Sequence, residues 1–253
     1  MLMITLYKDL KGISYNKLKN ELEGTFQLSV NSYHHNVYAV REALRCWSKN
    51  VLTVPQLDKL KAIARGQVQA KSFPNVQLWM DSTEFRLIGN RSMHATNPYW
   101  SKKVKGHGRK WLFLHDARGR VVFAFGPVSP KAYDSHLFCR HMETVEKALP
   151  GAVIIADNHF RKAAEITEKV TLVTNISKAG RPRMVKGKRM KRTLTSDQEA
   201  HNADVSFIRG RVEAPYGHWQ NLFKTLDKPF GDSPDQLDCL VRFAAAVHRL
   251  KVE

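Results

Sequence analysis

The chain has 253 residues, 43% of them hydrophobic, which is enough to bury the core of one large domain with a small helical appendage. Apolar runs stay short of the roughly 18–20 residues that a membrane helix needs, and the first residues lack a secretory signal, so we expect a soluble, intracellular protein. Lys and Arg outnumber Asp and Glu by 41 to 23, and a net charge of +18 favours a nucleic acid over a membrane as partner.

Residues 1–70 are predicted to be helical, because apolar residues recur near helical spacing in three stretches. The stretches read SYNKLKNELEG, SYHHNVYAVREALRCWSKN and TVPQLDKLKAIARGQ. Short helices separated by turns can form a helix-turn-helix that binds DNA, and a plain helical packing unit is the alternative.

From residue 76 the pattern changes to strands. VQLWMD predicts a strand that ends near Asp81, with a second extended piece after it. KWLFLHDARGRVVFAFG predicts a hairpin, and YDSHLFCRHMETVEKALPG predicts one helix with Asp134 as its favoured N-cap. The next strand, GAVIIAD, ends on Asp157.

A short helix, a strand in EKVTLVTNIS, a largely helical segment 195–226 and a closing amphipathic helix over 234–250 complete the chain. Strands that alternate with helices indicate an α/β sheet. The order fits a ribonuclease-H-like core, a mixed five-stranded sheet with flanking helices, in which three antiparallel strands come first and later strands join parallel to the first. We expect residues 76–253 to form this domain, preceded by the helical region 1–70.

Two basic clusters stand apart from the predicted core. The first is a loop over 178–194 that contains Arg181, Arg183, Lys186, Lys188, Arg189, Lys191 and Arg192, and the second contains Lys102, Lys103, Lys105, Arg109 and Lys110. Like charges at this density repel one another, so we expect the loop to be mobile without phosphate. Both clusters are candidates for contacts with a DNA backbone, and solvated surface is the alternative for each.

Three carboxylates form the candidate site. Asp81 and Asp157 end the first and fourth core strands, and Glu213 lies on the long helix that follows the last strand. If these strands are neighbours, the two aspartates meet at one edge of the sheet. Three converging carboxylates could hold two Mg²⁺ ions, since hard cations prefer oxygen ligands. Taken singly, the acids could also be turn, Asx-turn and solvated helix residues.

These motifs resemble the DDE transposases of the PIF/Harbinger type and their bacterial insertion-sequence relatives, over about residues 76–250. MDSTEF is similar to the first-aspartate motif, IIADNHF to the second-aspartate strand, and FIRGRVEAPYGHWQNLFKTL to the Arg-x-x-x-Glu helix with its aromatic-Gly pair, here Tyr216 and Gly217. The order and spacing of the motifs make the set more specific than any one of them.

The resemblance implies a metal-dependent DNA endonuclease and strand transferase with Asp81, Asp157 and Glu213 as ligands of two Mg²⁺ or Mn²⁺ ions. Arg209 and Arg211 would contact DNA. The expected partners are element ends, target DNA, further copies of the chain and a possible separate DNA-binding protein, and the expected location is the nucleus in a eukaryote or the nucleoid in a bacterium.

Two other interpretations remain open at this point. Ala214 and Gln220 stand where the family usually has basic residues, and Phe160 stands where it has Tyr, which allows a recruited transposase that binds DNA or protein without cutting. A ribonuclease-H-fold nuclease for RNA–DNA hybrids would need a fourth acid. His159 and His218 lie near the proposed acids in sequence, and each could have a role at the site.

Overall fold

The computed structural model describes most of the chain. Outside the described residues lie 24, 27, 67–72, 74, 89–96, 177–182, 186–187, 191–193 and 252–253, together with the side chains of 183–185, 188–190, 211–215 and 251. The helices are α1 Leu2–Lys11, α2 Tyr15–Leu22, α3 Val30–Val51, α4 Leu57–Arg65, α5 Asp134–Cys139, α6 Met142–Ala148, the 3₁₀ helix η1 Asn158–Phe160, α7 Arg161–Ala164, α8 Ser196–Leu222, α9 Lys224–Asp227 and α10 Pro234–Lys251. The strands are β1 Leu78–Leu87, β2 Trp100–Ser101, β3 Gly106–Asp116, β4 Val121–Val128, β5 Val153–Ile155, β6 Thr171–Val173, β7 Arg183–Val185 and β8 Lys188–Met190.

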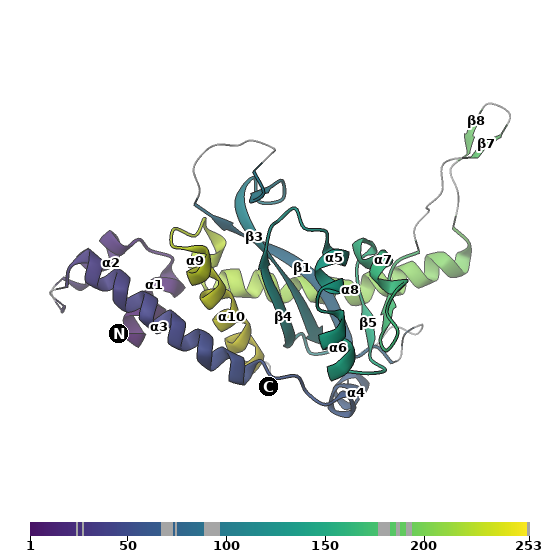
Figure 1. The fold of residues 1–253 in the computed structure, drawn as a ribbon, viewed down its shortest axis with the longest axis horizontal. Helices are drawn as coiled ribbons and strands as arrows, with labels where there is room; N and C mark the ends of the chain where they lie inside the picture. Colours follow the sequence, from purple (N-terminus) through teal and green to yellow (C-terminus); the bar gives the residue numbers. More distant parts are fainter. Residues whose placement is uncertain are drawn as a thin grey trace.

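A six-stranded mixed sheet forms the centre of the molecule (Figure 1). Its order is β2-β3-β1-β5-β6, with β4 also paired to β3. β1, β3 and β4 are antiparallel, and β5 and β6 join parallel to β1, so the predicted ribonuclease-H-like arrangement is confirmed. The sixth strand is the two-residue β2, which is too short to be visible as a pattern in the sequence.

Alternate residues of the strands face two separate cores, as the period of two in a strand requires. Leu78, Met80 and Leu114 pack with the apolar residues of α5, α6 and α7. Trp79 and Phe113, on the other face, pack with α8 and α10. Figure 1 shows α8 crossing the sheet on the side opposite α5, α6 and α7. The sheet is thereby covered on both faces by helices.

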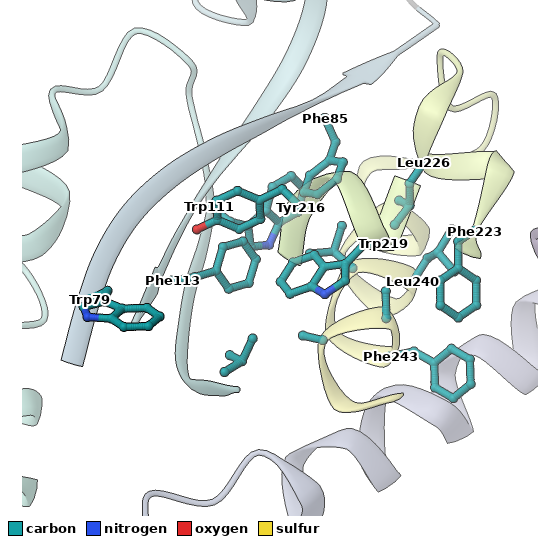
Figure 2. Packing of buried hydrophobic residues seen from close by; sticks show 14 of the residues in the cluster. Trp79, Phe85, Trp111, Phe113, Tyr216, Trp219, Phe223, Leu226, Leu240 and Phe243 are labelled. Carbon is teal, nitrogen blue, oxygen red and sulfur yellow. The ribbon is translucent and has the colours of Figure 1, made fainter. Parts of the chain in front are cut away.

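Aromatic residues fill the core beneath α8 (Figure 2). Trp219 is fully buried and meets Phe113 edge-on, with ring centroids 5.0 Å apart. Val205 and Ile208 of α8 and Phe223 at its C-terminal end are buried in the same cluster. The helix continues without interruption across position 215, although proline removes one of its backbone donors.

The N-terminal helices join the rest of the fold through α3, which runs beside α10 in Figure 1. The buried Arg41 of α3 donates to Asp9 of α1, with 3.0 Å between Nε and Oδ2, and to Asp232 before α10, with 2.6 Å between Nη1 and Oδ2. Desolvation opposes charges in this position, and their mutual pairing offsets it. Leu60 of α4 is buried in the core between the sheet and α5, α6 and α7. This helix therefore packs against the sheet, with residues that follow it in the chain.

Three local predictions were wrong. β1 does not end near Asp81 but runs through it to Leu87, because β3 pairs with it along its whole length. The predicted single helix is divided into α5 and α6 by a turn at Arg140 and His141. Asp134 is not the N-cap, which is Tyr133, because its carboxylate instead pairs with the ammonium of Lys110, 3.0 Å away.

No described helix is long and apolar enough to cross a membrane. Within the basic loop 178–194 the structure describes only the backbone of β7 and β8, which pair antiparallel and stand away from the sheet in Figure 1.

Replacing Arg41 with Ala would leave Asp9 as a buried carboxylate without its guanidinium partner. We expect the free energy of unfolding to fall by about 3–5 kcal/mol, measured by denaturant titration. Arg45→Ala is the control, because its pair with Glu42 is partly exposed to solvent and should contribute no more than about 1 kcal/mol. Equal losses in the two variants would contradict the structural role of the buried cluster.

Candidate active site

Two aspartates lie opposite each other where β1 and β5 run in parallel. The pairing joins Leu78 to Ile154 and Trp79 to Ile155. Continuing the same register by two residues places Asp81 level with Asp157. The negative charge of Asp157 contributes to the raised pKa of Asp81. The sequence placed these acids at one sheet edge, and the structure brings them together there.

Asp157 begins the 3₁₀ helix η1, where its side chain caps the first turn by accepting from the backbone N–H of Asn158. It also accepts from Arg209 of α8, with 2.9 Å between Nη2 and Oδ2. Both side chains are about a quarter exposed, at 26% for Arg209 and 28% for Asp157, so the pair lies at the mouth of the site. Arg209 therefore connects α8 to the end of β5 at Asp157.

Tyr216, further along α8, reaches the other aspartate. Its hydroxyl donates to the backbone carbonyl of Asp81 across 3.2 Å. Positions 209, 213 and 216 share one face of an α-helix, because they are spaced by four and three residues. The backbone at Glu213 thus lies between the contact to Asp157 and the contact to Asp81. The side chains of Glu213 and Arg211 lie outside the described residues.

Burial raises the pKa of Asp81 to about 6. This value includes a smaller upward contribution from the charge of Asp157, and downward contributions from a hydrogen bond with the Ser82 backbone and from the charges of Lys103 and Arg209. None of the described Lys or Arg side chains forms an ion pair with Asp81. A partly buried carboxylate beside a second carboxylate is thus short of positive charge.

This shortage fits a divalent cation, which oxygen ligands of this kind would hold. Among the described residues, no group of three or more His, Cys, Asp or Glu could hold a metal ion. The side chain of Glu213, the third acid of the predicted set, is not among the described residues.

Lys102, Lys103 and Lys105 of the predicted basic cluster are exposed in the β2–β3 turn. Lys110 is not part of that surface, because it is buried and pairs with Asp134. Lys103 lies near enough to Asp81 to act on its pKa. In the basic loop, Arg181, Lys186, Lys191 and Arg192 lie outside the described residues, and Arg183, Lys188 and Arg189 are described by backbone alone.

Three further residues lie near the acids in sequence. His159 is exposed on η1, and His218 meets His248 edge-on, with 5.7 Å between ring centroids. Glu84 follows Asp81 by three residues and so faces the opposite side of β1, where Lys110 lies 3.7 Å away. It does not supply the fourth acid of a hybrid-specific nuclease.

A buried residue that sequence reasoning did not single out is His115 of β3. Its Nε2 lies 3.2 Å from the hydroxyl of Tyr216, and its Nδ1 lies 3.1 Å from the carbonyl oxygen of Gly119. In the sequence, His115 is marked only by its position at the end of an otherwise apolar strand. A histidine in that position is also typical of an ordinary turn.

The family model described as DDE superfamily endonuclease matches residues 80–249, a span that begins one residue before Asp81 and includes all three acids. The chain belongs to this family. No curated protein and no solved structure matches the chain. The family supports a nuclease or transposase function and does not decide the PIF/Harbinger subtype.

The raised pKa of Asp81 predicts that the side chain destabilises the fold at high pH. Its folded pKa of about 6 exceeds the model-peptide value of 3.8, so the penalty is absent below about pH 4 and complete above about pH 7. In buffer containing a chelator, Asp81→Asn should raise the free energy of unfolding at pH 8 by about 2–3 kcal/mol, from about 1.4 kcal/mol per pKa unit. The gain should disappear near pH 4.

Asp58→Asn is the control, since the side chain of Asp58 is 95% exposed. It should change stability little at either pH. A gain for Asp81→Asn that is the same at pH 4 and pH 8 would show that burial, not ionisation, is responsible.

Proposed function

We propose that this protein is a DDE transposase that cuts and joins DNA by divalent-metal-dependent phosphoryl transfer. The observation that carries the proposal is the register of β1 and β5, which sets Asp81 level with Asp157 on neighbouring parallel strands. The path of α8 supports it, because contacts from Arg209 and Tyr216 reach one aspartate each and Glu213 lies between them.

Asp81, Asp157 and Glu213 would hold two Mg²⁺ or Mn²⁺ ions. When bound, such ions activate the attacking water or 3′-hydroxyl and stabilise the leaving oxygen in an in-line displacement at phosphorus. The raised pKa of Asp81, which comes mainly from burial, is compatible with this assignment, because a dication would stabilise the ionised form of a carboxyl in this position.

The surrounding cations would bind the DNA backbone. Arg209 neutralises Asp157 in the structure, and a metal ion on the same carboxylate would leave the guanidinium available for a phosphate oxygen. Lys103 stands close to Asp81, and Lys102 and Lys105 extend the positive surface outward from it. The net charge of +18 would hold the polyanion around this acidic centre.

The finer features of the proposal follow the resemblance. The substrates would be element ends and target DNA, and the helices within 1–70 would act as a helix-turn-helix that holds DNA beside the nuclease domain. Further copies of the chain, and a separate DNA-binding protein, would complete the assembly. The protein would work where the DNA is, in a nucleus or a bacterial nucleoid.

Removing a ligand should abolish cleavage. Asp157→Asn and Glu213→Ala should each lower Mg²⁺-dependent cleavage of a labelled duplex by about a hundredfold or more, since metal stabilisation of the transition state contributes several kcal/mol. DNA affinity should remain close to that of the wild type. Glu199→Ala is the control on the same helix, at an exposed position in its first turn, and should cleave normally.

Metal-dependent cleavage that persists in either variant would remove that residue from the site. A wild type that binds DNA but cleaves none of the plausible duplexes would instead favour a recruited transposase without catalysis.

The basic turn should contribute to DNA binding through phosphates. Replacing Lys102 and Lys105 by Ala should weaken binding across sequences and reduce the slope of log K against log salt by about 2. The matched control replaces Lys147 and Lys169, two exposed lysines on the other side of the sheet, and should leave the slope unchanged. An equal reduction in both double variants would mean that the turn makes no specific contact with DNA.

A further inference from the structure

The hydroxyl of Tyr216 occupies an unusual position for a core aromatic side chain. The ring packs among Phe113, His115 and Trp219, with centroid distances of 5.7, 5.4 and 5.4 Å. Figure 2 shows the oxygen, its red atom, turned from this cluster toward the strands. Its hydrogen-bond partner there is the main-chain carbonyl of the candidate ligand Asp81.

His115 holds the same hydroxyl from the other side. Burial lowers the pKa of His115 to about 4, so the imidazole is neutral at physiological pH. The Gly119 carbonyl can only accept, so Nδ1 carries the ring's proton and Nε2 accepts from Tyr216. The single hydroxyl proton is therefore shared between Nε2 and the Asp81 carbonyl, and both contacts fix the orientation of the phenol.

The hydrogen bond from Tyr216 to Asp81 lies next to the point where the pairing of β1 with β5 ends, and this position matters for the geometry of the site. The parallel pairing of β1 with β5 stops at Trp79 and Ile155, two residues before both aspartates. Tyr216 then connects α8 directly to β1 at Asp81, and it lies three residues, less than one helical turn, after Glu213. A shift of α8 along the sheet would have to break this hydrogen bond.

We propose that Tyr216 is a positioning residue of the active site, whose buried hydroxyl fixes α8 against β1 and so sets the spacing of Glu213 and Asp81. The inference rests on the proposed function, in which these two acids share metal ions. Tyr216 touches neither metal nor substrate, and it acts through the backbone of Asp81 and the helix that carries Glu213.

Tyr216→Phe tests the proposal, because it removes the hydroxyl and keeps the ring that packs in the core. We expect Mn²⁺ affinity, measured by calorimetric titration of the full chain, to fall on the order of tenfold, as for other supporting contacts around metal ligands. In cleavage assays kcat should fall while KM for DNA stays the same, because the basic surface that binds DNA is untouched.

Tyr33→Phe is the matched control. Tyr33 is also a buried tyrosine, and its hydroxyl also donates to a backbone carbonyl, that of Phe26, at 3.2 Å, but it lies in the N-terminal helical cluster. Both variants should lose a similar amount of stability, so any effect of a missing buried hydroxyl alone appears in both. Only Tyr216→Phe should lose metal affinity.

The two ways of failing are distinguishable. If the wild type binds Mn²⁺ and Tyr216→Phe matches Tyr33→Phe in Mn²⁺ affinity and in kcat, then Tyr216 is only a core residue and the positioning role is wrong. If the wild type and Tyr33→Phe bind no Mn²⁺ and cleave no DNA, the proposed function itself is overturned, and the positioning role with it.

Discussion

The pairing of β1 on both of its edges is the constraint on which the site depends. β3 pairs with β1 over its whole length, past Asp81 to Leu87, whereas the pairing of β5 with β1 ends at Ile155. Two carboxylates are thereby fixed side by side although their charges repel. The backbone must hold the two carboxylates in place, and it does so because β1 is paired with a neighbouring strand on each of its edges.

Charge of the opposite sign surrounds this pair without cancelling it. Arg209 forms an ion pair with Asp157. The charge of Lys103, in the β2–β3 turn, lowers the pKa of Asp81. A fully neutralised pair would have little affinity for a cation, and an isolated pair would have little affinity for DNA. Partial compensation at the mouth of the site, inside a strongly basic protein, suits a centre that must attract both.

Much of this arrangement could be predicted from the sequence, because it depends on local patterns. Apolar runs ending in Asp81 and Asp157 and the alternation of strands with helices gave the sheet order and the meeting of the two aspartates. The continuity of β1 could not be predicted, since it depends on long-range pairing with β3. The pairing of Asp134 with Lys110 and the contacts of Tyr216 with His115 and Asp81 join residues more than 20 positions apart, and no short motif reports such partners.

The buried Arg41 also limits how the molecule can move. Because one guanidinium binds Asp9 of α1 and Asp232 of the segment before α10, the N-terminal helices cannot swing on a hinge without exposing unpaired charges. If these helices bind DNA, as proposed, the bound DNA would be kept at a constant distance from Asp81. The position of a cut would then be set by its distance from the DNA segment that these helices bind, and not by the bases at the point of cleavage.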